Sequence, residues 1–469
     1  MIGLSSKLLL EVKRMRKNVR GIAAILSVTV MAASCMTGCG KQQEVENTTK
    51  DGRIKLTLAA IGDDDYNLAD YISGFNSSQD KYYVEKSETE YYRSYGDEDE
   101  EEESAEDGII KLQREVICGE GPDIIDYGTA FCTSDIVGEY VEDLSGYLTK
   151  EYGDYNEKFY GNVFDAFSYK GKIYAIPSGF CVKTLVGKEK NLGGLESWDL
   201  EQMIDTYNKQ QGMKLWVSAT QMGVLTDVLI PNMEKYLDWE NGKALFDSDS
   251  FKELLTFTKG LTTSPGKKPD YNDLAEDKAL LFYLYASGEF DVSQVQRIFR
   301  DDDVAYIGYP TDDKNGTMVQ TGGTTLAISI SSKKKEGAWE FIKYVLSDEA
   351  QINVQDGFSV NRKVMQDRLQ EAQTPEHTDS DSGEQESSVK AEYYLSEDET
   401  IRIYSISEDD AKKTEKLLNS QFCSANIDWK LYYVVLEEAQ AYLDDAQELD
   451  KTIENIQSRA NIYVAERGM

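Results

Sequence analysis

The first indication of how this chain folds lies in residues 169–180, which read YKGKIYAIPSGF. The KGK segment predicts a turn, because its glycine adopts positive φ at little steric cost. The apolar run Ile173–Ile176 predicts a short strand, which ends at Pro177 because proline has no N–H to give to a sheet. Gly179 allows the backbone to bend, and a second apolar run begins at Phe180. The stretch therefore predicts a turn, a strand, a bend and another strand.

The chain before this stretch alternates between strand and helix patterns. Residues 54–61 predict an inner strand of an α/β sheet, and residues 66–75 predict a helix with one apolar face. A second strand is expected at Tyr82–Glu85, a helix at Ile109–Cys118 and a short buried strand at Ile124–Asp126. The acidic block at 97–107 lacks the spaced oxygens and turn glycine of a calcium loop, so we interpret it as a solvated segment.

The first 38 residues have the pattern of an export signal. Residues 1–20 carry six basic residues against the single acid Glu11, and Gly21–Ala33 is apolar but too short to span a bilayer. Met36-Thr37-Gly38-Cys39 resembles a bacterial lipobox, which predicts cleavage before Cys39 and diacylation of its sulfur. An ordinary cleavage site is the alternative, and Ala33-Ser34-Cys35 is a weaker frame. With residues 39–52 as a tether, we expect an extracytoplasmic protein anchored to the outer face of the membrane.

Composition limits the partners of the mature chain. The 469 residues carry a net charge of −35, and removal of residues 1–38, with six bases and one acid, leaves a charge near −40. Such a surface repels nucleic acid and anionic headgroups, so we expect no nucleic-acid partner and membrane contact only through the lipid anchor. About 430 residues remain, which is enough for two domains.

The residues available for catalysis argue against most hydrolases. His377 is the only histidine and lies in a polar segment, so neither a zinc site built on paired histidines nor a Ser-His-Asp or Cys-His constellation fits. Glycoside hydrolysis by two carboxylates stays open because the chain has 85 acids. Cys118 and Cys132 could form a bridge, but buried free thiols are preferred. We expect no enzyme activity, no cofactor and no metal.

Several short motifs, in their order along the chain, resemble a known family. They are GPDIID at 121–126, VEDL at 141–144, GKIYAIP at 171–177, GYPT at 308–311, GGTTLAI at 322–328, GAWEFI at 337–342 and QDGFSVN at 355–361. Together they resemble the extracellular solute-binding proteins of ABC importers, family 1, which includes the maltose-binding type. The resemblance runs from about residue 54 to the C-terminus and rests on order and spacing rather than on any single motif.

The resemblance implies an α/β, two-lobed periplasmic-binding-protein-like fold of type II, with discontinuous lobes joined by crossing strands around a ligand cleft. The implied N-terminal lobe is 53–174 with 311–347, and the C-terminal lobe is 175–310 with 348–469, with a flexible acidic insertion at 374–389. The crossings would be Tyr174–Lys183 and Asp303–Asp313. Helices of the second lobe are expected at Trp198–Tyr207, Phe246–Leu261 and Asn272–Phe290, and terminal helices at Asp428–Tyr442 and Glu448–Ala465.

The implied function is capture of a small-molecule solute, an oligosaccharide in the preferred hypothesis, by a monomer that delivers it to ABC transporter permease subunits. Binding a sugar takes an aromatic surface for its C–H face and polar acceptors for its hydroxyls. The Gly322-Gly323 step would also let backbone amides approach a ligand closely. The candidate ligand-binding residues are Asp63, Asp126, Tyr127, Phe180, Trp216, Tyr285, Gly322 and Gly323. Peptide or polyamine ligands stay open. The alternatives from other classes are an extracytoplasmic carbohydrate-active enzyme with a carboxylate pair, and a sensing or adhesion lipoprotein that kept the fold.

Overall fold

The computed structural model describes residues 48–61, 66–89, 91, 105–128, 140–210, 212–239, 241–263, 268–355, 357–375, 377–379, 385–424 and 428–467. The chain divides into two compact units, residues 1–55 and 56–469. In the first unit, Thr49 organises a turn by accepting the backbone N–H of Arg53 on its hydroxyl (3.0 Å) and that of Gly52 on its carbonyl (3.0 Å). The signal sequence, Cys39 and Asp63 lie outside the described residues. The remainder of the description concerns the second unit.

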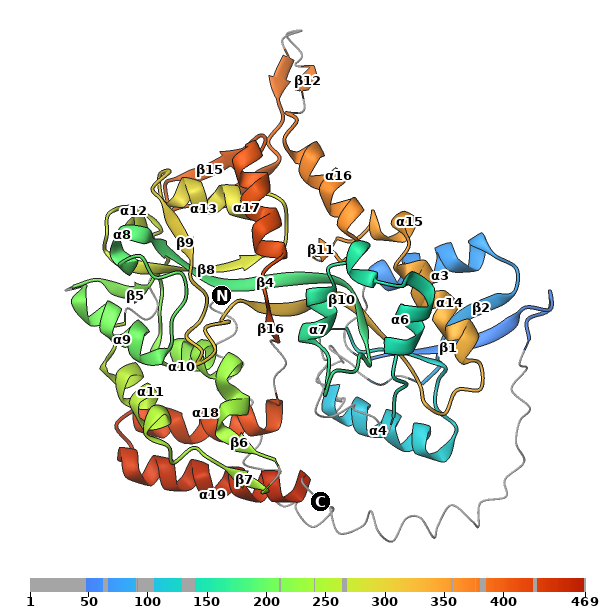
Figure 1. The fold of residues 1–469 in the computed structure, drawn as a ribbon, viewed down its shortest axis with the longest axis horizontal. Coiled ribbons are helices and arrows are strands. Elements are labelled where there is room, and N and C mark those ends of the chain that lie inside the picture. Colours follow the sequence, from blue (N-terminus) through green and yellow to red (C-terminus); the bar gives the residue numbers. More distant parts are fainter. Residues whose placement is uncertain are drawn as a thin grey trace, which may run out of the picture. The chain divides into compact units, whose positions relative to one another are not determined.

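Within the described residues, ten strands form one sheet in the order β2-β1-β3-β10-β4-β8-β5, with β9 and β11 beside β4 and β16 beside β10 (Figure 1). The strands are β1 Ile54–Ala60, β2 Tyr82–Lys86, β3 Ile124–Asp126, β4 Ile176–Lys188, β5 Lys214–Trp216, β8 Ala279–Ala286, β9 Val304–Tyr306, β10 Met318–Ile328, β11 Phe358–Ser359 and β16 Cys423–Ser424. Helices alternate with these strands, so the expected α/β class is confirmed.

The first half of the sheet, which we define as β1, β2 and β3, matches the sequence prediction closely. Its helices include α3 Tyr66–Ser78 and α4 Ala105–Cys118, and further on α6 Ser145–Tyr152, α7 Gly161–Ala166, α14 Lys335–Val345 and α15 Asp348–Gln351. β1 and β3 are parallel, and β3 pairs antiparallel with β10. The α14 helix packs on α3 and β10, and its Trp339 is buried, as its helical spacing predicts.

Two long strands connect this half to the rest of the chain. The first expected crossing forms β4, which pairs with β10 and then β9 along one edge and with β8 along the other. β4 begins at Ile176 and continues through Pro177, so the prediction of a separate strand at Ile173–Ile176 that ends at Pro177 is wrong. The second connection, expected at Asp303–Asp313, enters the sheet as β9 beside the end of β4, and β10 then continues to β3. Pairing of β4 with β10 is irregular between Gly322 and Thr325. The sheet ladder is therefore interrupted at the GG step.

The second half of the sheet, defined as β5 and β8, contains one error of prediction. Residues Asn272–Phe290 were expected as a helix, but they form the short helix α12 Asn272–Ala275 followed by the strand β8. The sequence ALLFYLYA is almost continuously apolar, as strands buried on both faces are, and periodicity alone does not separate such a run from a buried helix. Neighbouring helices include α8 Glu189–Leu192, α9 Leu200–Lys209, α10 Gln221–Leu229, α11 Asp249–Gly260 and α13 Asp291–Ile298.

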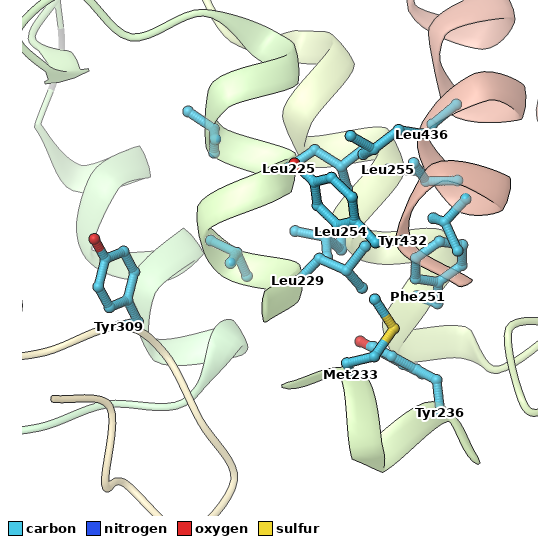
Figure 2. Close-up of a cluster of buried hydrophobic side chains, with 14 of the residues drawn as sticks. Leu225, Leu229, Met233, Tyr236, Phe251, Leu254, Leu255, Tyr309, Tyr432 and Leu436 are labelled. Atoms are coloured by element: carbon cyan, nitrogen blue, oxygen red, sulfur yellow. The ribbon is translucent and has the colours of Figure 1, made fainter. Parts of the chain in front are cut away.

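The terminal helices α18 Trp429–Leu443 and α19 Leu449–Arg467 complete the core of this half, as predicted. They contact each other and α11; α18 also contacts α10, and α19 also contacts β7 Lys243–Ala244, which pairs with β6 Leu237–Asp238 (Figure 1). Figure 2 shows Leu225 and Leu229 of α10 directed toward Leu254 of α11 and Tyr432 of α18. Burial of these side chains is the main stabilising contribution to the half.

Between α16 Arg362–Ala372 and α17 Glu408–Leu418 lie two hairpins. They are β12 His377–Asp379 with β13 Gln385–Ser387, inside the expected insertion, and β14 Ala391–Tyr394 with β15 Thr400–Ile403. Tyr393 attaches the second hairpin to α13 by donating its hydroxyl hydrogen bond to Asp291 (2.9 Å).

Among the helices of the described residues, none combines the length and apolar character needed to cross a bilayer.

Candidate functional site

The second half of the sheet carries a polar group whose centre is Asp227. It lies on α10, which begins at Thr220, whose hydroxyl accepts the Gly223 N–H (3.0 Å). Leu225 and Leu229 point into the helical core. Asp227 follows Leu225 by two residues, which at about 100° per residue turns its side chain away from Leu225 by roughly 200°. The apolar side of α10 thus fixes the helix, and Asp227 lies outside the face that Leu225 occupies.

Four side chains from four other segments lie within electrostatic reach of Asp227. They are Lys183 of β4, Tyr283 of β8, Tyr309 after β9 and Tyr432 of α18. Burial raises the pKa of the Asp227 carboxyl to about 6, and Lys183 opposes this shift. The residue nevertheless keeps partial exposure. The Asp227 carboxyl is therefore desolvated by neighbouring side chains but is still partly reached by solvent.

Lys183 of β4 interacts electrostatically with this carboxyl. Burial lowers the pKa of its ammonium, and Asp227 and Cys181 act in the opposite direction. Its Nζ lies 5.6 Å from the ring centroid of Tyr285, its partner across the β4–β8 ladder. Tyr285 is 44% exposed, so a substantial part of its side chain remains accessible beside the half-buried Lys183.

The acid and the base do not satisfy each other. Within the part of the chain that the structure describes, neither the Asp227 carboxylate nor the Lys183 ammonium makes a hydrogen bond or an ion pair, although each shifts the pKa of the other. Desolvated charges are costly unless hydrogen-bonded partners compensate them. Because both residues keep partial exposure, solvent or a solute can supply their remaining hydrogen bonds, and the pair is a candidate binding site.

Three tyrosines also interact with Asp227. Tyr283 and Tyr309 have ring centroids 6.5 Å apart in an edge-to-face arrangement, and burial, Asp227 and their mutual interaction hold the pKa of Tyr309 well above its usual value. The Tyr432 hydroxyl donates a hydrogen bond to Thr226 Oγ1 (3.2 Å), and the ring centroids of Tyr432 and Tyr433 are 5.5 Å apart. We call Lys183, Asp227, Tyr283, Tyr309 and Tyr432 the Asp227 cluster.

A tight loop positions Tyr309 within the cluster. The Tyr309 N–H donates to the Gly316 carbonyl (2.8 Å), and the indole N–H of Trp198 donates to the Gly308 carbonyl (2.9 Å). Gly308 has φ = +76°, and a Cβ at Gly316 would lie 1.7 Å from the Tyr309 carbonyl oxygen. Only glycine fits at Gly316, and Gly308 has the positive φ that glycine adopts most readily. The glycine of the GYPT motif at 308–311 is therefore explained by the tight backbone that holds Tyr309.

Four of the sequence-predicted residues meet at the end of β3. The Asp126 carboxylate Oδ1 accepts the backbone N–H of Thr325 (2.7 Å) and of Gly128 (2.9 Å). Gly322 and Gly323 lie in the irregular step of β10, where Gly323 has φ = +67°. Tyr127, beside them, is 2% exposed, and burial raises its pKa. Here Asp126 compensates backbone donors that the interrupted ladder leaves without strand partners.

The other predicted residues lie apart from this group and from one another. Phe180 is fully buried, with ring centroids 5.7 Å from Tyr160, 5.7 Å from Phe358 and 6.3 Å from Phe422. Trp216 is buried in the core of the second half. Tyr285 alone lies beside the Asp227 cluster, through Lys183. Asp63 lies outside the described residues, and the roles of all eight remain predictions.

Sequence reasoning missed every member of the Asp227 cluster. One signal was present: Lys183 interrupts the apolar run FCVKTLVG, and Asp227 interrupts GVLTDVLI. A charge inside an apolar segment requires a partner or a ligand, but the pattern does not say which charges share one site. In the described segments, no group of three or more acidic, cysteine or histidine side chains is arranged to hold a metal ion.

Cysteines play no evident part in this site. Cys118 is exposed, so the preference for a buried thiol is wrong at that residue, whereas Cys181 is buried. Cys132 lies outside the described residues, so a Cys118–Cys132 bridge remains a prediction. Cys423 is half-buried at the edge of β10, and burial raises the pKa of its thiol to about 12. A thiol with so high a pKa is a poor nucleophile at neutral pH.

Comparisons with known proteins identify the class to which this fold belongs. A family model described as bacterial extracellular solute-binding protein matches residues 100–378, more than half of the chain, and the chain belongs to this family. It is therefore an extracytoplasmic solute-binding protein, as the motif order predicted. A search of curated protein sequences finds no significant match.

Solved structures show the same two-lobed fold at low sequence identity. The sugar-binding protein MalE from Xanthomonas citri is 12% identical with a TM-score of 0.53, over 88% of this chain and 98% of its own. An extracellular solute-binding protein family 1 member from Alicyclobacillus acidocaldarius is 13% identical with a TM-score of 0.53, over 88% and 99%. A periplasmic oligogalacturonide-binding protein from Yersinia enterocolitica is 12% identical with a TM-score of 0.52, over 89% and 100%. The expected two-lobed fold class is confirmed.

Proposed function

We propose that this protein captures an oligosaccharide at the Asp227 cluster and delivers it to the permease subunits of an ABC transporter. The observation that carries the proposal is the desolvated acid and base, Asp227 and Lys183, which lack hydrogen-bonded partners among the described residues. A sugar hydroxyl both donates to a carboxylate and accepts from an ammonium, so one ring edge satisfies both groups. The accessible ring of Tyr285 offers a face for its C–H groups.

Further support comes from the two sites at which polar groups gather. The Asp227 cluster belongs to the proposed C-terminal lobe, 175–310 with 348–469, and the Asp126 region to the proposed N-terminal lobe, 53–174 with 311–347. A solute that contacts both lobes favours a closed state by its differential affinity for that state. The permease would read the closed state, and a lipid on Cys39 would hold the monomer at the outer face of the membrane.

The test is a thermal-shift and calorimetric screen of the purified protein against neutral and acidic oligosaccharides, peptides and polyamines. A true solute raises the unfolding midpoint with its concentration. Replacement of Lys183 by Met should weaken that binding at least tenfold, since it removes a charge-assisted hydrogen bond of about 1.5–3 kcal/mol. Lys190→Met, an exposed lysine beyond the end of the same strand, serves as the matched control. Binding of peptides or polyamines only, or equal binding by both variants, would refute the proposal.

The anchor and the permease are tested separately. Cys39→Ser should release the protein from the membrane fraction into the medium, because one thiol carries the lipid. Uptake of the bound oligosaccharide should be lost on deletion of the protein and restored by the wild-type chain. Persistence of membrane association in Cys39→Ser would contradict the lipid anchor without affecting solute binding.

A further inference from the structure

The C-terminal end of α17 is held by two side chains that come from α7 and α16. Asn162 of α7 donates from Nδ2 to the carbonyls of Leu418 (2.9 Å) and Ser420 (2.8 Å). Arg362, the first residue of α16, donates from Nη1 to Asn419 Oδ1 (2.7 Å). The last carbonyls of a helix have no partner within the helix, so Asn162 satisfies groups that would otherwise need water. We call this group of five residues the α17 clasp.

The α17 clasp joins elements that belong to different halves of the sheet. The α7 helix is one of the first-half helices, and Arg362 is fixed beside it because Nε donates to the carbonyls of Asn156 (2.9 Å) and Phe159 (2.8 Å). The α17 helix packs on α13 of the second half, where Lys413 Nζ donates to Gln296 Oε1 (3.0 Å). The clasp therefore ties the first half to a helix that the second half carries.

The clasp lies on the side of β4 to which Phe180 points. The Phe180 ring centroid is 5.7 Å from that of Tyr160 and 6.3 Å from that of Phe422, which follows the clasp in the chain. The guanidinium carbon of Arg362 lies 4.4 Å from the Tyr160 ring centroid. Lys183 comes three residues after Phe180, so it points to the opposite face of the strand, because side chains alternate along a strand. Figure 1 likewise shows α17 and α10 on opposite sides of β4.

The two faces of the crossing strands β4 and β10 differ in their access to solvent. On the clasp face, side chains of both strands are fully or almost fully buried: Phe180, Val182, Thr184, Val319 and Thr321. On the opposite face Lys183 is half-buried, and Tyr285, its partner on β8, is 44% exposed. Solvent therefore reaches these strands from the Lys183 face, and a solute has access from the same side.

We propose, resting on the proposed capture of a solute between the two lobes, that the α17 clasp opposes closure and so sets the affinity for the solute. Halves that close toward the Lys183 face turn about β4 and β10, and this rotation draws α7 away from the end of α17 on the other face. The three hydrogen bonds of the clasp act over short distances, so closure breaks them. Their free energy favours the open state, and the apparent affinity falls with the fraction of protein that is competent to bind.

Isothermal titration of the purified protein tests this with maltotriose, cellotriose, trigalacturonate, trialanine and spermidine as probes. Asn162→Ala removes two of the three hydrogen bonds and should bind the effective probe about tenfold more tightly than the wild type. Asn419→Ala, an exposed position that removes the acceptor of Arg362, should tighten binding about threefold. Ser420→Ala is the matched control, because its hydroxyl bonds within α17 to the Lys416 carbonyl (3.3 Å) and its own carbonyl still accepts from Asn162. It should bind within about twofold of the wild type.

The outcomes separate the two proposals. If an oligosaccharide binds the wild type and Asn162→Ala equally, or the variant more weakly, the inference is overturned and the proposed function stands. If trialanine or spermidine alone binds, and binds Asn162→Ala more tightly, the clasp is supported and the proposed oligosaccharide is refuted. If none of the probes binds, the proposed function fails, and small-angle X-ray scattering of the unliganded proteins decides on the clasp. The double variant Asn162→Ala with Asn419→Ala should then have a smaller radius of gyration than the wild type, and equal radii overturn the inference. If Asn162→Ala does not fold, Asn419→Ala against Ser420→Ala is the deciding comparison, and equal affinities overturn the inference.

Discussion

Lys188, at the end of β4, offers a strict test of how this strand is held in the sheet. It is 2% exposed, and its ammonium donates to the Ala275 carbonyl (2.8 Å) and forms ion pairs with Asp277 (3.0 Å) and Asp302 (2.9 Å). These contacts join β4 to the α12–β8 turn and to the segment that leads into β9. Because β4 also carries Lys183, the anchor supports the strand that presents the Asp227 cluster.

We expect Lys188→Met, which keeps the chain length and removes the charge, to lower the free energy of unfolding by about 2 kcal/mol at pH 7. Breaking a buried ion pair typically costs about 3–5 kcal/mol. Here the two carboxylates remain 35% and 49% exposed, so solvent hydrates them after the change and reduces the loss. The variant no longer has to bury an ammonium, which offsets a further part of the lost stability. The Ala275 carbonyl loses its hydrogen-bond donor, which lowers the stability again.

The assay is equilibrium urea unfolding followed by tryptophan fluorescence. Lys190→Met is the control, because Lys190 binds the same Asp277 at 2.9 Å but is 59% exposed. The control should unfold close to the wild type, since exposed ion pairs contribute little. Equal midpoints for the two variants would show that burial of Lys188 does not determine the effect, and the reasoning would be refuted.

The pH dependence of this difference has a definite sign. Partial burial acts to raise the pKa of Asp277, but hydrogen bonds from Lys190, Asn191 and Lys188 lower it to about 2. A lowered carboxyl pKa contributes stability that is present above the unfolded value near 4 and is lost as pH falls through the folded value. The gap between wild type and Lys188→Met should therefore be full at pH 5 and close between about pH 4 and pH 2.

Three further changes give distinct outcomes. Gly316→Ala should destabilise the protein by about 2 kcal/mol or more and weaken solute binding, because its Cβ would lie 1.7 Å from the Tyr309 carbonyl; Gly146→Ala, in open space on α6, should be neutral or slightly stabilising by urea unfolding. Asp126→Ala should cost about 1–3 kcal/mol even without ligand, since two backbone N–H groups lose their acceptor, and Asp126→Asn should cost less; identical midpoints would contradict this structural role. Asp227→Asn should stabilise the unliganded protein by about 1–2 kcal/mol at pH 7 and leave its stability unchanged at pH 4. The reason is that the raised pKa of the Asp227 carboxyl makes its ionisation destabilising above pH 4. A loss of stability at pH 7 would contradict the raised pKa.

Local patterns were sufficient for much of the fold. The alternating and apolar runs of β1, β2 and β3, the amphipathic spacing of α3, α14, α18 and α19, and the order of the strand-end motifs each depend on neighbours a few residues away. Such short-range information is printed in the sequence, which is why the α/β class and the family could be inferred from it. It failed at Ala279–Ala286, where a uniformly apolar run has no period that separates strand from helix.

The candidate site is a different matter, because its members come from distant segments. The five residues of the Asp227 cluster lie on β4, α10, β8, the segment after β9 and α18. Only the packing of these elements brings an acid, a base and three tyrosines within electrostatic reach of one another. The sequence by itself determined that each charge interrupts an apolar segment. Tertiary structure decided that Asp126 accepts two backbone N–H groups, whereas Asp227 and Lys183 influence each other without an ion pair among the described residues. The physical reason is that desolvation and partner geometry depend on residues far apart in the chain.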